Sequence, residues 1–470
     1  MRILVAIANH GTRNLKHLQV LLTEYRRIPF QVDIVVLSDT NKNLGQDMEV
    51  RVGLPTGNPW SLPFAHKPLF AERSNDYDLF IYTEDDVLIT EQNIRAFLQA
   101  TEVLPEDHIA GFMRYEISPE GKRYYSTIHG HYHWEPNSVM RMGEFIFARL
   151  TNDHSGCFII TRRQLGKALA SGGFLLGFRR GRYGYPETAA TDIYTQCGFK
   201  KVICISHLHD FCLPHLPNVY IGKLGVETEI ADREIAKLAS LNGGGEVLGP
   251  LFKTETGLQD ASWNKNYYEF AREDLLALVP PGAKNVLSVG CGWGETESKL
   301  SQRGVKVAGI PLDCIVAVTA KAKGIEVVPP DMELARRYLA KRRFDCIIFE
   351  DSLHRFKDPV AVLKDYALLL DQSGVVVVSV PNFAHVSVLR KKLSGDLTLR
   401  RRNRREAFAN YGLHFTTFLE VKQWLRQSGL TPMAWNLELG HLFKWIARLS
   451  FGTTRRLLLE KIVVVAKKAA

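Results

Sequence analysis

The chain has few cysteines and no long apolar run. Only seven of its 470 residues are cysteine. They are odd in number and lack the paired spacing of a disulfide framework, so free thiols in a reducing compartment are expected. No run of eighteen apolar residues occurs, which predicts that no helix spans a membrane. The first residues, Met1 to Ala8, have the pattern of a core strand rather than of a signal peptide. These absences predict a cytoplasmic protein.

Length and composition indicate a folded protein of more than one domain. The hydrophobic fraction is 46%, which is that of an ordinary globular protein, and 470 residues exceed what one core usually holds. The stretch 226–261 combines a charged helical pattern with a Gly-Gly-Gly run and is interpreted as a linker. The predicted domains are therefore residues 1–225 and 262–470, both doubly wound domains of the α/β class.

The most informative segment reads VLSVGCGWGE, from Val286 to Glu295. A β-branched run typical of a buried strand leads into Gly290, Gly292 and Gly294, and a helical pattern follows. Glycines at alternate positions let backbone amides approach a ligand, and the helix N-terminus adds partial positive charge. A dinucleotide-binding fold would place its third glycine one residue later. The spacing here resembles the first motif of class I S-adenosylmethionine-dependent methyltransferases.

The flanking segments extend this resemblance to roughly residues 262–470. Further strand patterns alternate with helix-length segments, which favours a doubly wound sheet. These strands are predicted at 304–310, 344–351, 375–380 and 460–466, the last of them antiparallel. The resemblance implies a Rossmann-like sheet of seven strands.

The same resemblance implies a site for S-adenosylmethionine around the three glycines. In the family, a carboxylate at the end of the second strand binds the ribose hydroxyls, but Pro311 stands at that place in this chain. Asp313, two residues further on, is the candidate substitute. Asp331 sits where the family places an acid beside the adenine, and Glu350, followed by Asp351, lies near the methionine end.

Methyl transfer requires in-line placement of the reacting groups and exclusion of water. A general base helps when a hydroxyl is the acceptor. His385, in the loop after Pro381-Asn382, is the predicted base, and His354 and His414 are weaker candidates. The alternative is that His385 is only a solvated or hydrogen-bonded loop residue.

The first half of the chain contains a second ligand-binding pattern. Strand, helix and strand follow one another over residues 1–37, with Asp39 at the tip, and ligands of such half-sheets sit beyond the strand ends. The next strand, 77–83, runs into Glu84-Asp85-Asp86. Three adjacent acids repel one another, so we expect Mn²⁺ or Mg²⁺ to bind there together with a diphosphate.

Together these features resemble a glycosyltransferase of the A fold over about residues 1–225. Glu84 and Asp86 fill the acidic positions of that family's D-x-D metal motif. Asp192 sits where the family carries an acid that often serves as base, and His207 and His209 sit where a late histidine completes the metal shell. The resemblance implies a nucleotide-sugar donor and a glycan or glycolipid acceptor.

Three histidines, His129, His131 and His133, alternate as in a strand and would share one face. Such an array could bind zinc. No acid or cysteine accompanies them at close spacing, so a strand in an acceptor groove is the favoured interpretation.

Positive charge is concentrated near the end of the chain. Residues 385–470 carry 17 Lys and Arg against 5 Asp and Glu, a net of +12, whereas the whole chain carries +10. The main clusters are 390–392 and 400–405, and 442–459 has an apolar and basic helical pattern. No aromatic-rich binding module accompanies them, so nucleic acid is not the expected partner. An anionic acceptor, peripheral contact with an anionic membrane, or a solvated charged surface all fit.

These observations favour a cytoplasmic two-domain protein of surface polysaccharide or glycoconjugate biosynthesis. Its methyltransferase domain would modify a sugar or glycan hydroxyl, and its first domain would resemble a metal-dependent glycosyltransferase. One alternative is a methyltransferase whose first domain only binds the glycan. Another, favoured by Pro311, is a non-enzymatic scaffold in which both sites are degraded.

Overall fold

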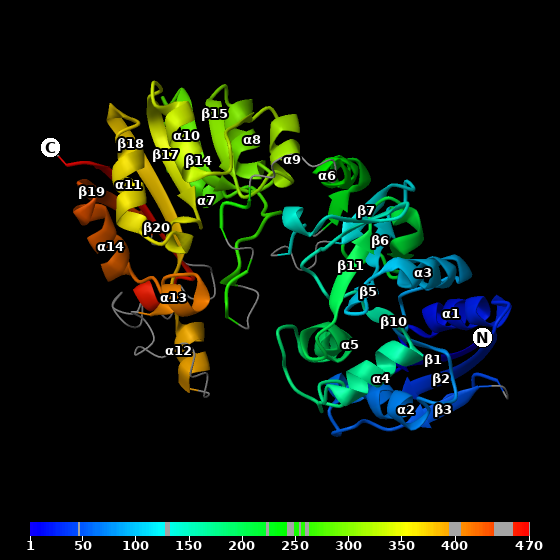
Figure 1. Cartoon of the computed structure of the whole chain (residues 1–470). Helices are drawn as coiled ribbons and strands as arrows, with labels where there is room; N and C mark the ends of the chain where they lie inside the picture. Colours follow the sequence, from blue (N-terminus) through cyan, green and yellow to red (C-terminus); the bar gives the residue numbers. More distant parts are fainter. Residues whose placement is uncertain are drawn as a thin grey trace. The chain divides into compact units, whose positions relative to one another are not determined.

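The computed structural model describes residues 1–45, 48–126, 132–221, 225–241, 249–252, 255–258, 263–393, 406–436 and 455–469. The chain divides into two compact units, Met1–Gly245 and Glu246–Ala470 (Figure 1). Helix α6 (Thr228–Leu241), inside the segment interpreted as a linker, belongs to the first unit. His129, His131, the basic cluster 400–405 and residues 442–454 of the basic helical pattern lie outside the described residues.

The first unit is built on a five-stranded sheet of order β10-β4-β1-β2-β3. Its strands are β1 (Arg2–Asn9), β2 (Gln31–Ser38), β3 (Glu49–Val52), β4 (Leu79–Glu84) and β10 (Cys157–Thr161). Strand β1 is central and buried at every position after Arg2, which explains its unbroken apolar run. Because β10 is antiparallel to β4, the predicted doubly wound parallel sheet describes only the other four strands.

Two four-stranded sheets complete the first unit, with orders β5-β11-β9-β8 and β12-β6-β7-β13. Their strands are β5 (His108–Ala110), β11 (Lys200–Cys204), β9 (Phe145–Ala148), β8 (Met140–Met142), β12 (Cys212–Pro214), β6 (Met113–Ile117), β7 (Arg123–Ser126) and β13 (Gly225–Glu227). The helical segments are α1 (Leu15–Arg27), η1 (Pro59–Ala65), α2 (His66–Glu72), α3 (Glu91–Val103), η2 (Pro136–Ser138), α4 (Arg162–Ala170), α5 (Tyr185–Thr195) and η3 (Leu208–Phe211).

The second unit contains a seven-stranded sheet of order β16-β15-β14-β17-β18-β20-β19. These strands are β14 (Asn285–Cys291), β15 (Lys306–Pro311), β16 (Glu326–Val327), β17 (Phe344–Glu350), β18 (Leu370–Pro381), β19 (Leu430–Asn436) and β20 (Lys461–Lys468). Strand β20 runs antiparallel to both β18 and β19, which confirms the predicted antiparallel last strand and the seven-stranded Rossmann-like fold.

Alternate residues of the central strands fill two separate cores, one on each face of this sheet. Leu287, Val289 and Ile347 belong to one core, and Val286 and Ile348 to the other. The helical segments of the unit are α7 (Glu273–Leu276), α8 (Glu295–Gln302), α9 (Val316–Ala322), α10 (Met332–Leu339), η5 (Leu353–Arg355), α11 (Pro359–Ala367), α12 (Val386–Leu393), α13 (Ala407–Tyr411), α14 (Phe418–Gln427) and η8 (Arg455–Leu457).

All seven cysteines are free thiols. In the parts of the chain that the structure describes, no helix is both long enough and apolar enough to cross a membrane.

Candidate functional site

The glycine loop of the second unit lies at the carboxyl end of β14, which pairs with β15 on one side and β17 on the other. Ligands of open α/β sheets bind beyond the strand ends at such a switch point. Gly290 and Gly294 both have φ of 84°, a left-handed conformation that glycine adopts without strain. Gly294 is also the N-cap of α8, so the first amides of that helix emerge at the same edge.

Gly292 is required by a contact within the chain. A Cβ atom at this position would lie 2.3 Å from the carbonyl oxygen of Tyr267, and the same oxygen accepts a hydrogen bond of 3.0 Å from the Trp293 amide. Residues 263–272, which precede the seven-stranded sheet and which we call the lead-in segment, therefore pack directly on the glycine loop. A side chain at position 292 would displace this segment whether or not a ligand is bound.

Asp313 is buried at the carboxyl end of β15, beyond Pro311. Its Oδ1 atom accepts hydrogen bonds from the amides of Ile315 (2.8 Å) and Val316 (3.0 Å) at the start of α9. Its Oδ2 atom is buried and accepts no hydrogen bond from the described residues. Burial raises the pKa of Asp313 to about 6 against the effect of the two amides. One oxygen thus holds the helix while the other is available to a donor.

Asp331 has a similar capping role but is exposed. Its Oδ1 atom accepts hydrogen bonds from the amides of Glu333 (3.0 Å) and Leu334 (2.9 Å) at the start of α10. The predicted adenine contact and the helix cap would share this carboxylate.

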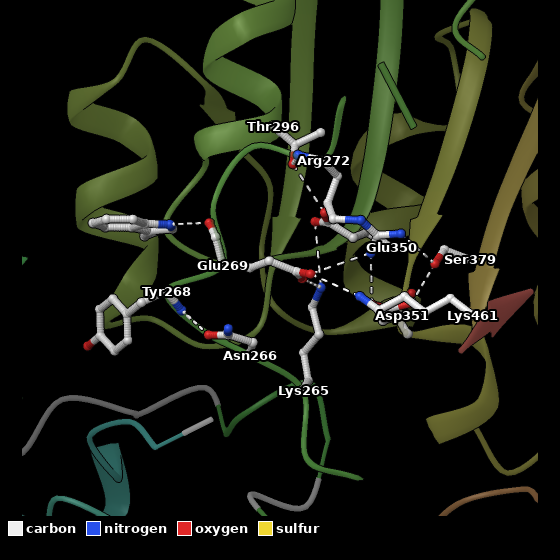
Figure 2. Close-up of polar contacts among 12 residues, drawn as sticks. Lys265, Asn266, Tyr268, Glu269, Arg272, Thr296, Glu350, Asp351, Ser379 and Lys461 are labelled. Carbon is white, nitrogen blue, oxygen red and sulfur yellow. Dashed lines mark hydrogen bonds and ion pairs between the residues drawn. The ribbon is translucent and has the colours of Figure 1, made fainter. Parts of the chain in front are cut away.

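Glu350 and Asp351 belong to a buried network of charges that Figure 2 shows at the ends of β17, β18 and β20. Lys265 Nζ lies 3.6 Å from Glu350 Oε2 and 3.3 Å from Glu269 Oε2. Thr296 donates a hydrogen bond of 3.1 Å to the other Glu350 oxygen. Burial, with the nearby Glu297 and Glu269, outweighs Lys265 and raises the pKa of Glu350 to about 7.

The carboxylate of Asp351 receives three donors from distant segments. Arg272 lies at 2.9 Å, Lys461 at 2.5 Å, and the Ser379 hydroxyl at 2.5 Å. Burial alone would raise the pKa of Asp351, but Lys461 and Arg272 hold it well below its ordinary value. Asp351 also has φ of 44°, a strained conformation for a residue other than glycine. These donors hold it there, and the network ties the lead-in segment to the strand ends.

The predicted base His385 follows β18 and is buried. Its Nδ1 atom lies 2.7 Å from the Ser387 hydroxyl, and burial lowers its pKa. The ring is therefore neutral near pH 7, the form that can accept a proton. Burial also lowers the pKa of His354, to about 3. His414 Nε2 lies 3.1 Å from the Phe356 carbonyl oxygen, which marks it as a structural residue.

The first unit has a cavity of about 580 Å³ at the carboxyl ends of β1 and β4. Strand β1 pairs with β2 on one side and β4 on the other, so this is the switch point of that sheet. The lining residues are Ala8, His10, Asn14, Pro59, Trp60, Leu62, Pro63, Glu84, Asp85, Asp86, Arg114, His154, Pro186, Glu187, His215 and Tyr220. The cavity volume is in the range of small-molecule sites.

The three adjacent acids have different surroundings. Asp85 accepts hydrogen bonds from Asn9 (2.5 Å) and Asn14 (2.8 Å), yet burial raises its pKa to about 6. Burial and the neighbouring Asp86 raise the pKa of Glu84 to about 8. Without a bound cation Glu84 is therefore mostly protonated near pH 7, and a bound cation would favour its charged form.

The histidine that faces Asp86 is His215, not His207 or His209. His215 Nε2 lies 3.6 Å from Asp86 Oδ2, because an antiparallel bridge pairs the backbone of His215 with Val87. His207 instead contacts Ser206 at 3.0 Å, His209 contacts Asp210 at 3.1 Å, and neither lines the cavity. The structure therefore places His215, rather than His207 or His209, beside Asp86.

Glu116 fixes the orientation of His215. Its Oε1 atom lies 2.6 Å from His215 Nδ1, and its Oε2 atom accepts hydrogen bonds from the amides of Tyr220 (2.9 Å) and Ile221 (3.0 Å). A carboxylate behind a histidine is the usual arrangement at metal sites. Within the described ranges, however, no three His, Cys, Asp or Glu side chains are arranged to hold a metal ion by themselves.

Asp192, the predicted base, is buried between two cations. It forms ion pairs with Lys67 and, at 2.5 Å, with Arg179, and it does not line the cavity. A carboxylate neutralised in this way is poorly placed to accept a proton from an acceptor. Glu187, from the first turn of the same helix α5, does line the cavity.

Asp39 follows β2 at the same edge of the sheet. Its Oδ1 atom accepts a hydrogen bond of 2.9 Å from the Gly11 amide, which lowers its pKa. Its other oxygen lies 3.7 Å from His10 Nε2, and His10 lines the cavity. Asp39 therefore supports the loop after β1 and does not itself line the cavity.

The second unit resembles S-adenosylmethionine-dependent methyltransferases. A family model described as "Methionine biosynthesis protein MetW" matches residues 271–431. The chain is 29% identical over 111 residues to the ubiquinone biosynthesis O-methyltransferase of Albidiferax ferrireducens, covering 22% of this chain and 44% of that protein. It is also 29% identical over 123 residues to an uncharacterized methyltransferase of Mycobacterium tuberculosis, covering 25% and 60%. The chain spans about half the length of the curated relatives it matches.

Matches among solved structures have lower identity and low TM-scores. A TehB-like SAM-dependent methyltransferase from Corynebacterium glutamicum shares 18% identity with a TM-score of 0.28, covering 41% of this chain and 84% of that one. A SAM-dependent methyltransferase from Archaeoglobus fulgidus shares 16% with a TM-score of 0.32, covering 42% and 90%.

Sequence reasoning missed several residues of both sites. Lys265, Arg272 and Lys461 meet Glu350 and Asp351 in space, but no spacing rule connects the lead-in segment with the last strand. His215 stands alone in the sequence between Pro214 and Leu216. Only the charges of the lead-in segment gave a signal that could have been followed.

Proposed function

We propose that the second unit transfers a methyl group from S-adenosylmethionine to a hydroxyl of a sugar or glycan. The observation that carries this proposal is the pairing of a left-handed glycine loop with a buried, unshared oxygen of Asp313 at one switch point. A buried carboxylate oxygen without a donor among the described residues is costly. A ribose hydroxyl would supply that donor.

The residues present fit S-adenosylmethionine if Asp313 takes the place of the carboxylate that the family carries at the end of its second strand. Pro311 ends β15 where the family carries its acid, and Asp313 offers a carboxylate oxygen two residues later. Gly290, Gly294 and the start of α8 would hold the polar part of the cofactor, and Asp331 would face its adenine. Glu350 would lie toward its methionine end, where the charge of Lys265 balances added negative charge.

S-adenosylmethionine, when bound, supplies an electrophilic methyl group. The chain's own contribution is to position the acceptor, exclude water and receive a proton. His385 is proposed as the base because its ring is neutral and its Nδ1 contact with Ser387 orients it. The ion pairs of Lys265 and Arg272 hold the lead-in segment closed over the loop.

Calorimetry of the full chain with S-adenosylmethionine and S-adenosylhomocysteine tests this proposal. Asp313→Asn keeps one oxygen for the cap of α9 but can replace the free oxygen with a donor group. We expect it to weaken binding about tenfold, the cost of one lost hydrogen bond to a charged group. Asp358→Asn is the matched control, because Asp358 caps α11 through the Ala361 amide outside the site. Absence of binding by the wild-type chain would overturn the proposal.

A second function is favoured by the acidic cavity of the first unit. We propose that it binds a nucleotide sugar through Mn²⁺ or Mg²⁺, for a glycosyltransferase step. The supporting observation is that Glu84 and Asp86 line the cavity together with His215, whose ring is oriented by Glu116. Asp86 and His215, whose side chains lie 3.6 Å apart, would each offer one ligand to the ion, and diphosphate oxygens and water would complete its shell. Glu187 replaces Asp192 as the proposed base.

Nucleotide binding in the presence and absence of Mn²⁺ tests the second function. Asp86→Ala and His215→Gln should abolish metal-dependent binding of nucleotide diphosphates and leave S-adenosylmethionine binding unchanged. His207→Gln and His209→Gln are the matched controls and should bind normally. If the wild-type chain binds a glycan but no nucleotide, the first unit is a glycan-binding module. If the wild-type chain binds neither S-adenosylmethionine nor a nucleotide, the chain is a scaffold.

The proposed setting is surface polysaccharide or glycoconjugate biosynthesis at the inner face of the membrane. The basic segments after His385 would favour a polyanionic glycan or an anionic lipid surface. The association of the chain with such a glycan or lipid surface should weaken steeply as salt concentration rises.

A further inference from the structure

A group of exposed apolar side chains borders the cavity of the first unit. It comprises Trp60, Leu175, Leu176 and Tyr185, which are 61%, 53%, 38% and 42% exposed, and we call it the cavity rim. Large apolar side chains exposed singly are common, but several on neighbouring loops mark an interaction surface. Figure 1 draws the connection between α4 and α5, which carries both leucines, as a long irregular loop beside α5.

The cavity rim is continuous with the cavity. Trp60 lines the cavity directly, and so does Pro186, the neighbour of Tyr185. Between them, Phe178 stacks on Tyr185 with ring centroids 4.9 Å apart and meets Phe64 edge-on at 5.7 Å. Trp60 and the neighbour of Tyr185 therefore link the rim to the lining of the cavity.

The loop is held firmly from behind. Lys67 Nζ donates a hydrogen bond of 3.1 Å to the Leu176 carbonyl oxygen and is itself paired with the buried Asp192. At the start of the loop, Gly173 packs on the Gln196 carbonyl oxygen so closely that a Cβ atom would lie 2.3 Å away. Because the backbone is anchored at both places, the two leucines cannot fold back into the core without breaking these contacts.

Positive charge accompanies the apolar side chains. Arg180 and Arg182 belong to this loop, whereas Lys67 and Arg179 are both paired with Asp192. Arg180 is exposed. Exposed leucines beside Trp, Tyr and Arg suit the boundary between lipid headgroups and acyl chains, where anionic phosphates attract Arg and aromatic rings lie at the interface.

We infer that the cavity rim docks the first unit on an anionic lipid bilayer, so that the cavity opens at the level of the headgroups. Leu175 and Leu176 would enter the acyl boundary, Trp60 and Tyr185 would lie among the headgroups, and Arg180 would contact lipid phosphate. This surface belongs to the first unit and includes none of the residues after His385. The inference goes beyond the proposed nucleotide-sugar site and does not depend on it.

Vesicle co-sedimentation of the full chain tests this inference. The vesicles contain phosphatidylcholine alone or mixed with phosphatidylglycerol. We expect the double variant Leu175→Ser/Leu176→Ser to lose at least about tenfold in affinity for the mixed vesicles. Binding of this variant no longer transfers two leucine side chains from water into the bilayer. Arg180→Glu should weaken binding to the mixed vesicles only. Trp60→Ala is an independent variant from another segment and should also weaken it.

Leu368→Ser and Leu419→Ser are the matched controls, since both leucines are exposed in the second unit. They should bind vesicles as the wild-type chain does. If the double variant bound the mixed vesicles with wild-type affinity, the inference would be overturned and lipid binding would be assigned to another surface. If the wild-type chain did not sediment with any vesicle, the inference would also be overturned. Nucleotide binding without vesicles should be the same in the double variant, which separates this test from that of the proposed function.

Discussion

The carbonyl oxygen of Tyr267 accepts a hydrogen bond of 3.0 Å from the Trp293 amide, directly above Gly292. This contact joins the lead-in segment to the glycine loop of the second unit. The loop therefore serves the folding of the chain as well as the proposed cofactor. Substitutions in it will change both.

Gly292→Ala should destabilise the second unit, because its Cβ atom would lie 2.3 Å from backbone oxygen. We expect a loss of about 1–3 kcal/mol in the free energy of unfolding, typical of overpacking. Gly282→Ala is the control, since no atom lies within 4 Å of its Cβ position. Urea denaturation of both variants measures the difference. Equal stability would mean that the lead-in segment does not pack on the loop.

Lys265→Met should also destabilise the second unit. It removes the cation between Glu350 and Glu269 and leaves buried negative charge without a partner. We expect a loss of about 2–4 kcal/mol at pH 8, and a smaller one at pH 6, where Glu350 can take up a proton. The exposed Lys299 provides the control variant Lys299→Met. Thermal unfolding of both variants is measured at pH 6 and pH 8. A loss of stability in Lys265→Met that does not depend on pH would contradict the pairing of Lys265 with Glu350.

Glu350→Gln should alter the pH dependence of stability. The pKa of Glu350 is raised from 4.5 to about 7 in the folded chain, so the folded state holds the proton more tightly than the unfolded state. The resulting stabilisation is complete below about pH 4.5 and is lost as pH rises through about 7. Between pH 5 and pH 8 the wild-type chain should therefore lose about 1–3 kcal/mol relative to Glu350→Gln. Parallel stability curves for the two proteins would disprove this.

Asp192→Asn should act on stability rather than on chemistry. It leaves Lys67 and Arg179 without their buried partner, and we expect a loss of about 3–5 kcal/mol in the first unit. Asp107→Asn removes an exposed pair with Lys200 and should change stability by only about 0–1 kcal/mol. Glu187→Gln should leave stability unchanged and abolish any transferase activity. An inactive but fully stable Asp192→Asn protein would restore Asp192 as the base.

Much of the second unit could be predicted from local patterns. The β-branched runs of β14, β17 and β18 recur with helical segments between them, and this alternation determines a doubly wound sheet because each face must be covered. The Gly-x-Gly-x-Gly spacing identified the loop. In the first unit the same logic found β1, β2 and β4, but β10 and the two smaller sheets depend on antiparallel pairings that no local period indicates.

The sequence by itself indicated the strands β1, β2, β4, β14, β15, β17, β18 and β20 and the glycine loop, because hydrophobic periodicity and glycine spacing are properties of adjacent residues. Only the tertiary structure decided which side chains meet at those ends. Lys67 meets Asp192 across 125 positions, Lys461 meets Asp351 across 110, and His215 rather than His207 faces Asp86. Lys67 and Asp192 meet between helices α2 and α5. The other two pairs form because a sheet brings distant strand ends to one edge, where desolvated charges must find partners.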